Sequence, residues 1–174
     1  MILFEDETIL RFFPPLRHRW AYQGEQALVP ITGYNAKRVL FGVLNLKTGH
    51  RIVLRRHQQR QADFQAFLQL MRTRYRHKPL ALLLDKASCH DAAKSQAVAR
   101  QLRIKLIWLP KQWSELKGMD HLWKELKRRS AANRQFETID QQADYAEQWL
   151  LGLSPRQALR KAGILSKHFW LRNV

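Results

Sequence analysis

Cysteine, acidic residues and long apolar runs are all scarce in this sequence. Cys89 is the only cysteine among 174 residues, so no disulfide can form within the chain, which fits a reducing compartment. The longest uncharged apolar run, LALLL at 80–84, is too short to span a bilayer. The first residues, MILFEDET, turn acidic at once and do not form a signal peptide. We therefore expect a soluble, cytoplasmic protein with no membrane partner.

The shortage of acids leaves a large positive charge. There are 14 Asp and Glu against 31 Lys and Arg, a formal net charge of +17. Self-repulsion at this charge is costly, and a polyanionic partner is the usual reason for it. Nucleic acid is the first candidate, because Lys and Arg neutralise phosphates. No basic amphipathic helix with a bulky apolar face favours a membrane surface. A merely soluble basic protein is the remaining interpretation.

The order of the expected elements predicts the fold. No repeat or Gly/Ser linker divides the chain, and 45% of it is hydrophobic, so residues 1–174 are expected to form one domain. Strands are predicted at 2–5, 27–32, 38–46, 51–55, 80–84 and 104–109. Helices are predicted at 64–75, 91–102, 114–129, 138–150 and 155–163, with Asp91, Ser114 and Ser154 as caps. This order predicts an α/β fold of the ribonuclease-H-like layout, a mixed central sheet with helices on both faces.

Three aspartates are candidates for a metal site. Asp6 follows the first strand, and Asp85 follows the buried run at 80–84. Carboxylates that end strands lie in the crevice where open sheets usually place their sites, although a turn or helix cap would also explain Asp85. Asp120 lies within a helix and shares a face with Leu116 and Trp123, where an unpaired charge would be costly. A salt bridge to an Arg is the alternative for Asp120.

The chemistry of three converging carboxylates points to hard cations. Oxygen ligands of this kind suit Mg²⁺ or Mn²⁺. Two ions about 4 Å apart can clamp the attacking and leaving oxygens of an in-line phosphoryl displacement. The sequence therefore predicts two ions per site, held by Asp6, Asp85 and Asp120, with Lys and Arg holding DNA against them.

Three blocks carry a resemblance to a known family. FEDET (4–8), LLLDKASCH (82–90) and LPKQWSELKGMDHLWKELK (109–127) resemble the catalytic domain of the mariner superfamily of transposases, especially its bacterial insertion-sequence branch. The 34 residues between Asp85 and Asp120 match the family's spacing, and the similarity runs from about residue 2 to 165. The sequence departs from the pattern at Lys86, where Asn is usual, and at Asp120, where the bacterial branch has Glu. It also departs at 110–115 and 117–119.

The resemblance implies a function and partners. It implies that Asp6, Asp85 and Asp120 are catalytic metal ligands, that element ends are nicked, and that the 3′ strand is transferred into TA sites of target DNA. The family's helix-turn-helix recognition module is expected to be absent here, as in a split or truncated gene. We expect double-stranded DNA as partner, a homodimer on DNA, a separately encoded helix-turn-helix subunit and a bacterial, nucleoid-associated location.

Other functions and contacts stay open at this point. A catalytically decayed DNA-binding remnant is one alternative, and a ribonuclease-H-like nuclease on hybrids or junctions is another. His90 could orient a phosphate or the attacking water, although a hydrogen bond at a helix start is favoured. Trp113 is the best candidate for stacking on a base, although core packing would also explain it. The candidate DNA-binding residues are Arg55, Arg56, Lys86, His90, Lys111 and Trp113.

Overall fold

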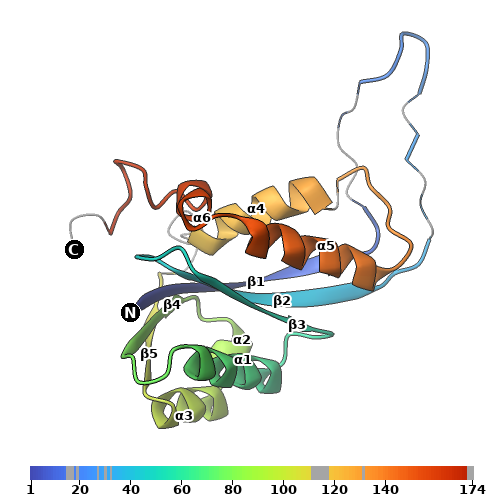
Figure 1. The fold of residues 1–174 in the computed structure, drawn as a ribbon. Helices are drawn as coiled ribbons and strands as arrows, with labels where there is room; N and C mark the ends of the chain where they lie inside the picture. The colour runs from blue at the N-terminus through green and yellow to red at the C-terminus, as the bar shows by residue number, and fades with distance from the viewer. Residues whose placement is uncertain are drawn as a thin grey trace.

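A five-stranded mixed sheet forms the centre of the molecule (Figure 1). The computed structural model describes residues 1–14, 18, 20–26, 28–29, 31, 33–110, 118–130 and 132–171. The strand order is β3-β2-β1-β4-β5, with antiparallel β1–β2 and β2–β3 pairs and parallel β1–β4 and β4–β5 pairs. The strands are β1 (Ile2–Arg11), β2 (Lys37–Asn45), β3 (Arg51–Arg56), β4 (Leu80–Leu84) and β5 (Ile104–Trp108).

Helices cover both faces of this sheet, as the sequence predicts. One layer consists of α1 (Gln61–Arg74), α2 (Ser88–Asp91) and α3 (Ala93–Gln101). The other layer consists of α4 (Gly118–Ser130), α5 (Ile139–Gly152) and α6 (Pro155–Lys161). Because β2 and β4 are covered on both sides, nearly all of their side chains are buried. None of the described helices is long and apolar enough to cross a membrane.

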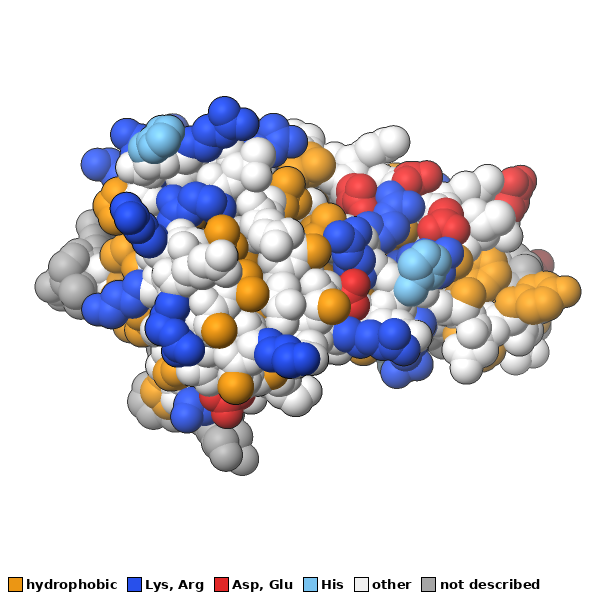
Figure 2. Space-filling model, turned by 90° about the horizontal axis from the view of Figure 1, so that it is seen from below, with side chains coloured by type: hydrophobic (Ala, Val, Ile, Leu, Met, Phe, Trp, Pro, Cys, Tyr) orange, Lys and Arg blue, Asp and Glu red, His pale blue; other side chains and the backbone are white. Residues whose placement is uncertain are grey.

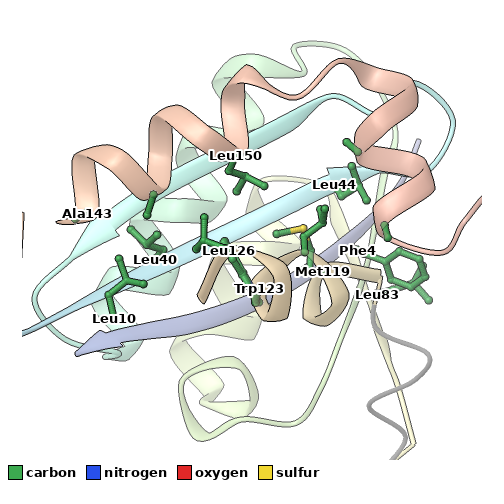
Figure 3. Close-up of a cluster of buried hydrophobic side chains, with 14 of the residues drawn as sticks. Phe4, Leu10, Leu40, Leu44, Leu83, Met119, Trp123, Leu126, Ala143 and Leu150 are labelled. Atoms are coloured by element: carbon green, nitrogen blue, oxygen red, sulfur yellow. The ribbon is translucent and has the colours of Figure 1, made fainter. Parts of the chain in front are cut away.

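Two apolar clusters hold the layers together. In Figure 3, side chains of β1 and β2 meet the buried faces of α4 and α5, with Trp123 among the largest fully buried side chains. The cluster on the other face joins the sheet to α1, through Phe64, Phe67, Leu68 and Met71. These α1 residues follow the helical spacing that the sequence shows. On the α4–α5 side, Trp123 is a residue of the buried core.

Two predicted helix starts are confirmed by their capping bonds. The Thr138 side chain accepts a hydrogen bond from the Gln141 backbone at the start of α5. Ser154 and Gln157 form a reciprocal capping box at the start of α6, with Pro155 at its first position. The predicted start at Ser114 lies outside the described residues, which resume at Gly118.

Three predicted boundaries are wrong. The first strand does not end at residue 5 but runs to Arg11, because β2 pairs with it along the whole of that length. The predicted strand at 27–32 is not formed at 28, 29 and 31, its described residues. Asp91 does not cap a helix through residue 102, since it is the last residue of α2, and Ala92 separates α2 from α3.

Candidate active site

The edge of the sheet where β4 ends brings Asp6 and Asp85 together. The parallel pairing of β1 with β4 ends at Phe4 and Leu83. Asp6 lies two residues beyond Phe4 within β1, and Asp85 lies two residues beyond Leu83, just after β4, so the two aspartates stand at the same level of the sheet. Beyond this level β1 continues to Arg11 without β4 beside it. This is the carboxyl end of a parallel strand, where open sheets usually form their sites.

A cleft of about 760 Å³ opens along this uncovered part of β1. Asp6 and Asp85 both line it, and Lys127 lines it from α4. Its remaining walls come from β1, the segment that follows β1, and the loop after β4. The other described lining residues are Glu7, Thr8, Ile9, Leu10, Arg11, Phe13, Pro14, Gln59 and Ala87.

A glycine in β2 sets the distance of α4 from the two strand acids. Gly42 pairs with Asp6 across the β1–β2 ladder. A Cβ atom at Gly42 would lie 2.6 Å from Trp123 Cη2 and 2.7 Å from Met119 Cε, so only glycine lets α4 pack this closely. Figure 3 shows Met119 and Trp123 against the sheet. The helix therefore lies close over the strand position that carries Asp6.

Asp120 is carried into this region by α4. It lies between Gly118, which packs against the Phe4 ring, and Trp123. It also lies seven residues, or about two helical turns, before Lys127, so the two residues are on the same side of α4. Asp120 is not among the described residues that line the cleft, but it stands at the end of α4 that is nearest to Asp6.

The carboxylate of Asp120 is not a buried unpaired charge. Its side chain is 25% exposed and forms an ion pair with Lys124, at 2.8 Å between Oδ2 and Nζ. The expected burial of this charge is therefore wrong, because the helix turns Asp120 to the margin of its apolar face. The salt bridge that the sequence left open exists, although with a Lys one turn along and not with an Arg.

A second polar group lies on the opposite face of β1. Side chains alternate along a strand, so Glu5 and Glu7 point away from the face of Asp6. Both glutamates are turned toward His90, whose Nε2 lies 2.7 Å from Glu7 Oε1 and 3.4 Å from Glu5 Oε2. Cys89 Sγ donates to Glu7 Oε1 at 3.4 Å. This Glu5–Glu7–Cys89–His90 group reaches the cleft through Glu7, which is one of its lining residues.

Burial and neighbouring polar groups both shift the pKa values of Glu5 and His90. Burial raises the pKa of Glu5 well above its usual range, and the Glu7 carboxylate raises it further. Burial alone lowers the pKa of His90, but the Glu5 carboxylate and hydrogen bonds with Asp85, Cys89 and Glu7 outweigh it, so the pKa of His90 is raised.

The three aspartates and the Glu5–Glu7–Cys89–His90 group differ as metal sites. Among the described residues, Glu7, Cys89 and His90 are the set of three whose ligand atoms all lie within 4.8 Å of one another. The carboxylates of Asp6, Asp85 and Asp120 are not such a set. Their donors are all carboxylate oxygens, the ligands that Mg²⁺ and Mn²⁺ prefer.

The predicted DNA contacts are dispersed over the molecule. Arg55 bonds Glu147 and Asp144 of α5, which raise its pKa, so its charge is already matched. Arg56 pairs with Asp63 at 3.3 Å, and Lys86 is exposed with its Nζ 5.9 Å from the centre of the Trp108 ring. Lys111 and Trp113 lie outside the described residues.

The prediction that His90 contacts DNA is wrong for this structure. Its side chain is fully buried, below the Phe64 ring and beside Glu7. The favoured alternative, a hydrogen bond at a helix start, is correct in part, since Nδ1 lies 3.0 Å from the Asp85 carbonyl oxygen. Sequence reasoning missed Glu5, Glu7 and Gly42. The alternation within FEDET was the available signal for the two glutamates.

Comparison with known proteins identifies similar sequences and folds. The profile of the family described as DDE superfamily endonuclease matches residues 1–142. No curated protein matches the sequence significantly. The structure resembles the Mos1 strand transfer complex, with a TM-score of 0.72, 16% identity, and coverage of 92% of this chain and 50% of that one.

Two further Mos1 structures show the same likeness. The Mos1 transposase paired-end complex with left transposon end has a TM-score of 0.74 at 16% identity, over 97% of this chain and 53% of that one. The catalytic domain of Mos1 mariner transposase has a TM-score of 0.64 at 14% identity, over 92% and 74%. The chain thus spans about half the length of the Mos1 chains in the two complexes. At these identities the likeness shows the shared ribonuclease-H-like fold.

Proposed function

The chain belongs to the DDE superfamily endonucleases, and from this premise we propose that it is a metal-dependent DNA transposase. In this proposal Asp6, Asp85 and Asp120 are the catalytic metal ligands. The reaction is the cutting of DNA at element ends, followed by transfer of the 3′ strand into target DNA. The fold is shared with Mos1 transposase, whose complexes contain transposon DNA.

The arrangement of the three acids carries the proposal. Asp6, within β1, and Asp85, just after β4, stand at one level of two adjacent parallel strands and line one cleft. The packing of α4 on Gly42 brings Asp120 to the same region from the facing layer. That three separate elements carry an aspartate toward this region, in a chain with only 14 acids, supports the proposal.

The donor set suits Mg²⁺ or Mn²⁺, and we propose two ions per site. Mos1 paired-end complexes with Mn and with Mg are known, and oxygen-only ligands favour the same ions here. When bound, such ions activate a water or a 3′-hydroxyl and stabilise the departing oxygen. The residues of this chain supply the rest. Asp6, Asp85 and Asp120 would hold the ions, and Arg11 and Lys127 of the cleft would hold a phosphate.

A basic face extends away from the cleft. Figure 2 shows the side of the molecule formed by the α1–α3 layer, where Lys and Arg gather. From residue 64 to 110 the only acids are Asp85 and Asp91. The exposed cations of this stretch are Arg74, Arg76, Lys78, Lys86, Lys94, Arg100, Arg103 and Lys105. Phosphate neutralisation by such residues is the general source of affinity for duplex DNA.

The partners beyond duplex DNA are part of the proposal. We propose a homodimer on DNA, a separately encoded helix-turn-helix subunit that recognises element ends, and work at the nucleoid of a bacterium. The basis is the resemblance of the three sequence blocks to bacterial insertion-sequence transposases, together with the Mos1 fold. Pull-down with a candidate upstream-encoded protein, and sedimentation with and without DNA, would test these partners directly.

A nicking assay tests the function. The chain should convert supercoiled plasmid to the open form with Mn²⁺ or Mg²⁺, and Asp85→Ala should lower the rate at least about 100-fold by removing a metal ligand. Asp144→Asn is the matched control, because Asp144 is an exposed acid on α5 that pairs with Arg55. An Asp85→Ala protein that nicks like the parent contradicts the assignment. DNA binding without metal-dependent nicking in the parent would identify a decayed remnant.

A further inference from the structure

His90 links the loop of one proposed metal ligand to the strand of another. Its Nδ1 lies 3.0 Å from the Asp85 carbonyl oxygen and 3.3 Å from Asp85 Oδ1. Its Nε2 lies 2.7 Å from Glu7 Oε1, on the strand that carries Asp6. Both ring nitrogens are therefore engaged, and the imidazole bridges the end of β4 and the middle of β1.

Contacts with Ala87 and His90 bear on the orientation of Asp85. It follows the last residue of β4, so no strand pairing fixes its backbone. Its Oδ1 accepts a hydrogen bond from the Ala87 backbone at 3.0 Å, and its side chain is 37% exposed. The contacts of His90 reach the same residue from the buried side. A shift of this loop would move one carboxylate of the proposed site relative to the other two.

We propose that His90 is a positioning residue, which holds Asp85 in the orientation that binds a divalent cation. The inference rests on the proposed function, because it gives His90 a task only if Asp85 is a metal ligand. Partners of this kind, which orient a ligand without touching the metal, typically affect metal affinity by about 10–100-fold.

The surroundings of His90 fit this role. The ring is fully buried and lies 4.4 Å from the Phe64 ring, centre to centre, so it has no room to turn. Glu7 holds the far nitrogen, which directs Nδ1–H at Asp85. The neighbouring Cys89 Sγ donates to the same Glu7 carboxylate oxygen at 3.4 Å, so its side chain is bonded to β1. Cys89 thus offers a matched control in the same buried group.

Two substitutions separate the two ends of the ring. The side-chain amide of Asn occupies nearly the place of Nδ1, so His90→Asn keeps a donor toward Asp85. The amide of Gln reaches the place of Nε2, so His90→Gln keeps the contact with Glu7 and loses the one with Asp85. If His90 acts through Asp85, the Gln variant is impaired and the Asn variant is largely rescued. If His90 only stabilised the fold, His90→Gln would not be impaired more than His90→Asn.

Two quantities are measured. The first is the dissociation constant for Mn²⁺, from the electron paramagnetic resonance signal of free Mn²⁺. The second is the Mn²⁺ concentration that gives half-maximal nicking. We expect His90→Gln to raise both values about tenfold or more. We expect His90→Asn and Cys89→Ala to stay within about threefold of the parent, since each keeps the bonds to Asp85. Far-UV circular dichroism verifies folding. Should His90→Gln not fold, Glu7→Gln carries the test, and it should weaken Mn²⁺ binding by releasing Nε2.

The outcomes separate this inference from the proposed function. Asp85→Asn should abolish tight Mn²⁺ binding in the parent. If Mn²⁺ binding needs Asp85 but is unchanged in His90→Gln, the inference about His90 is overturned and the proposed function stands. The same holds for unchanged binding in Glu7→Gln, if that variant has to be used because His90→Gln does not fold. Binding that does not need Asp85 overturns the proposed site and the inference with it. Loss of Mn²⁺ binding in Cys89→Ala would place the ion at Glu7, Cys89 and His90, and would also overturn the inference.

Discussion

Asp120 and Glu125 lie five residues apart on α4, and their surroundings differ in kind. Glu125 is bonded by Arg128 and Arg129 of its own helix and by Lys161 of α6. Asp120 has an ion pair with Lys124, whose side chain is mostly exposed. Five positions correspond to about 140° around a helix, so the two carboxylates also face different directions. Asp120 thus has fewer basic partners than Glu125, and the proposal takes it as the metal ligand on α4.

The choice between the acids of this helix is a testable prediction. Asp120→Ala should lose nicking in a Mn²⁺ assay, and Asp120→Glu should keep part of it, because the longer side chain still presents an oxygen ligand. Glu125→Gln should nick nearly as fast as the parent. Glu115→Ala should do the same, although Glu115 lies outside the described residues. An active Asp120→Ala beside an inactive Glu115→Ala would reverse the assignment.

Glu125 has a role of its own in stability, and the role depends on pH. Hydrogen bonds from Arg129, and then from Arg128 and Lys161, outweigh burial and lower the pKa of Glu125 to about 2 from an ordinary 4.5. A lowered pKa in the folded state stabilises the fold above the unfolded pKa, and the contribution is lost as pH falls through the folded one. The stability from this group is thus complete above about pH 4.5 and disappears toward pH 2.

Urea unfolding of the parent and Glu125→Gln checks this dependence. At pH 7 the parent should have the higher midpoint, because Gln cannot pair with the three cations. The difference should shrink steadily from pH 4.5 toward pH 2 as Glu125 is protonated. A difference between the midpoints that stays constant over this range would show that the carboxylate charge contributes nothing.

The residues of the site were predictable from sequence to different degrees. Asp6 and Asp85 were identified because each lies at the end of a predicted strand, and both do line the cleft. Glu5 and Glu7 were not, since acids in a row suggest an exposed turn. They are buried because His90, distant in sequence, supplies a positive partner on that face. A single sequence does not show such a pairing.

At the scale of elements, the contact between β2 and α4 depends on the absence of a side chain at Gly42. A methyl group there would meet the Trp123 ring and Met119 within 3 Å, and both are buried core residues without free space. Extra volume in a packed core forces side chains off their rotamers or shifts the backbone. Because α4 carries Asp120, such a shift would also move the third acid of the proposed site.

We expect Gly42→Ala to destabilise the fold by about 1–3 kcal/mol and to slow nicking more than it weakens DNA binding. Gly152→Ala is the control, because nothing lies within 4 Å of a Cβ atom at that end of α5. Its stability should equal or exceed that of the parent, since alanine restricts the unfolded chain. Equal urea midpoints for the Gly42→Ala and parent proteins would show that α4 can lift from β2 without cost.

The elements with strong local signals were predicted, and those fixed by long-range contacts were not. The caps at Thr138 and Ser154 need only residues three positions apart, so sequence shows them. The extension of β1 to Arg11 depends on pairing with β2 across the sheet. The break at Ala92 interrupts a helix-favouring stretch without any Gly or Pro, and we found no local signal for it in the sequence.

At the scale of the whole molecule, the acids and the excess cations are segregated. Three acids of α5, Asp140, Asp144 and Glu147, bond Arg38 and Arg55 of the neighbouring strands. The α1–α3 side has almost no acids, so its cations have few internal partners (Figure 2). Among the described residues, α5 thus carries acids that are matched by Arg38 and Arg55, while the cations of the α1–α3 side are largely unmatched by acids of that side. A polyanion such as duplex DNA would offset this repulsion on the α1–α3 side.

Salt dependence of DNA binding tests this view. Each phosphate contact releases counterions, so six to ten contacts would lower affinity by about 10³–10⁵ between 50 and 200 mM salt. We expect the chain to follow this steep dependence and to bind element-end and scrambled duplexes nearly equally, because surface Lys and Arg contact phosphates and not base edges.

Arg100→Glu with Lys105→Glu should weaken DNA binding and reduce the dependence of affinity on salt concentration. The same reversal at Arg156 and Arg160 of α6 is the control, and it should have a smaller effect. A gel-shift series that shows strong preference for one terminal sequence, or an equal effect of both reversals, would contradict the prediction.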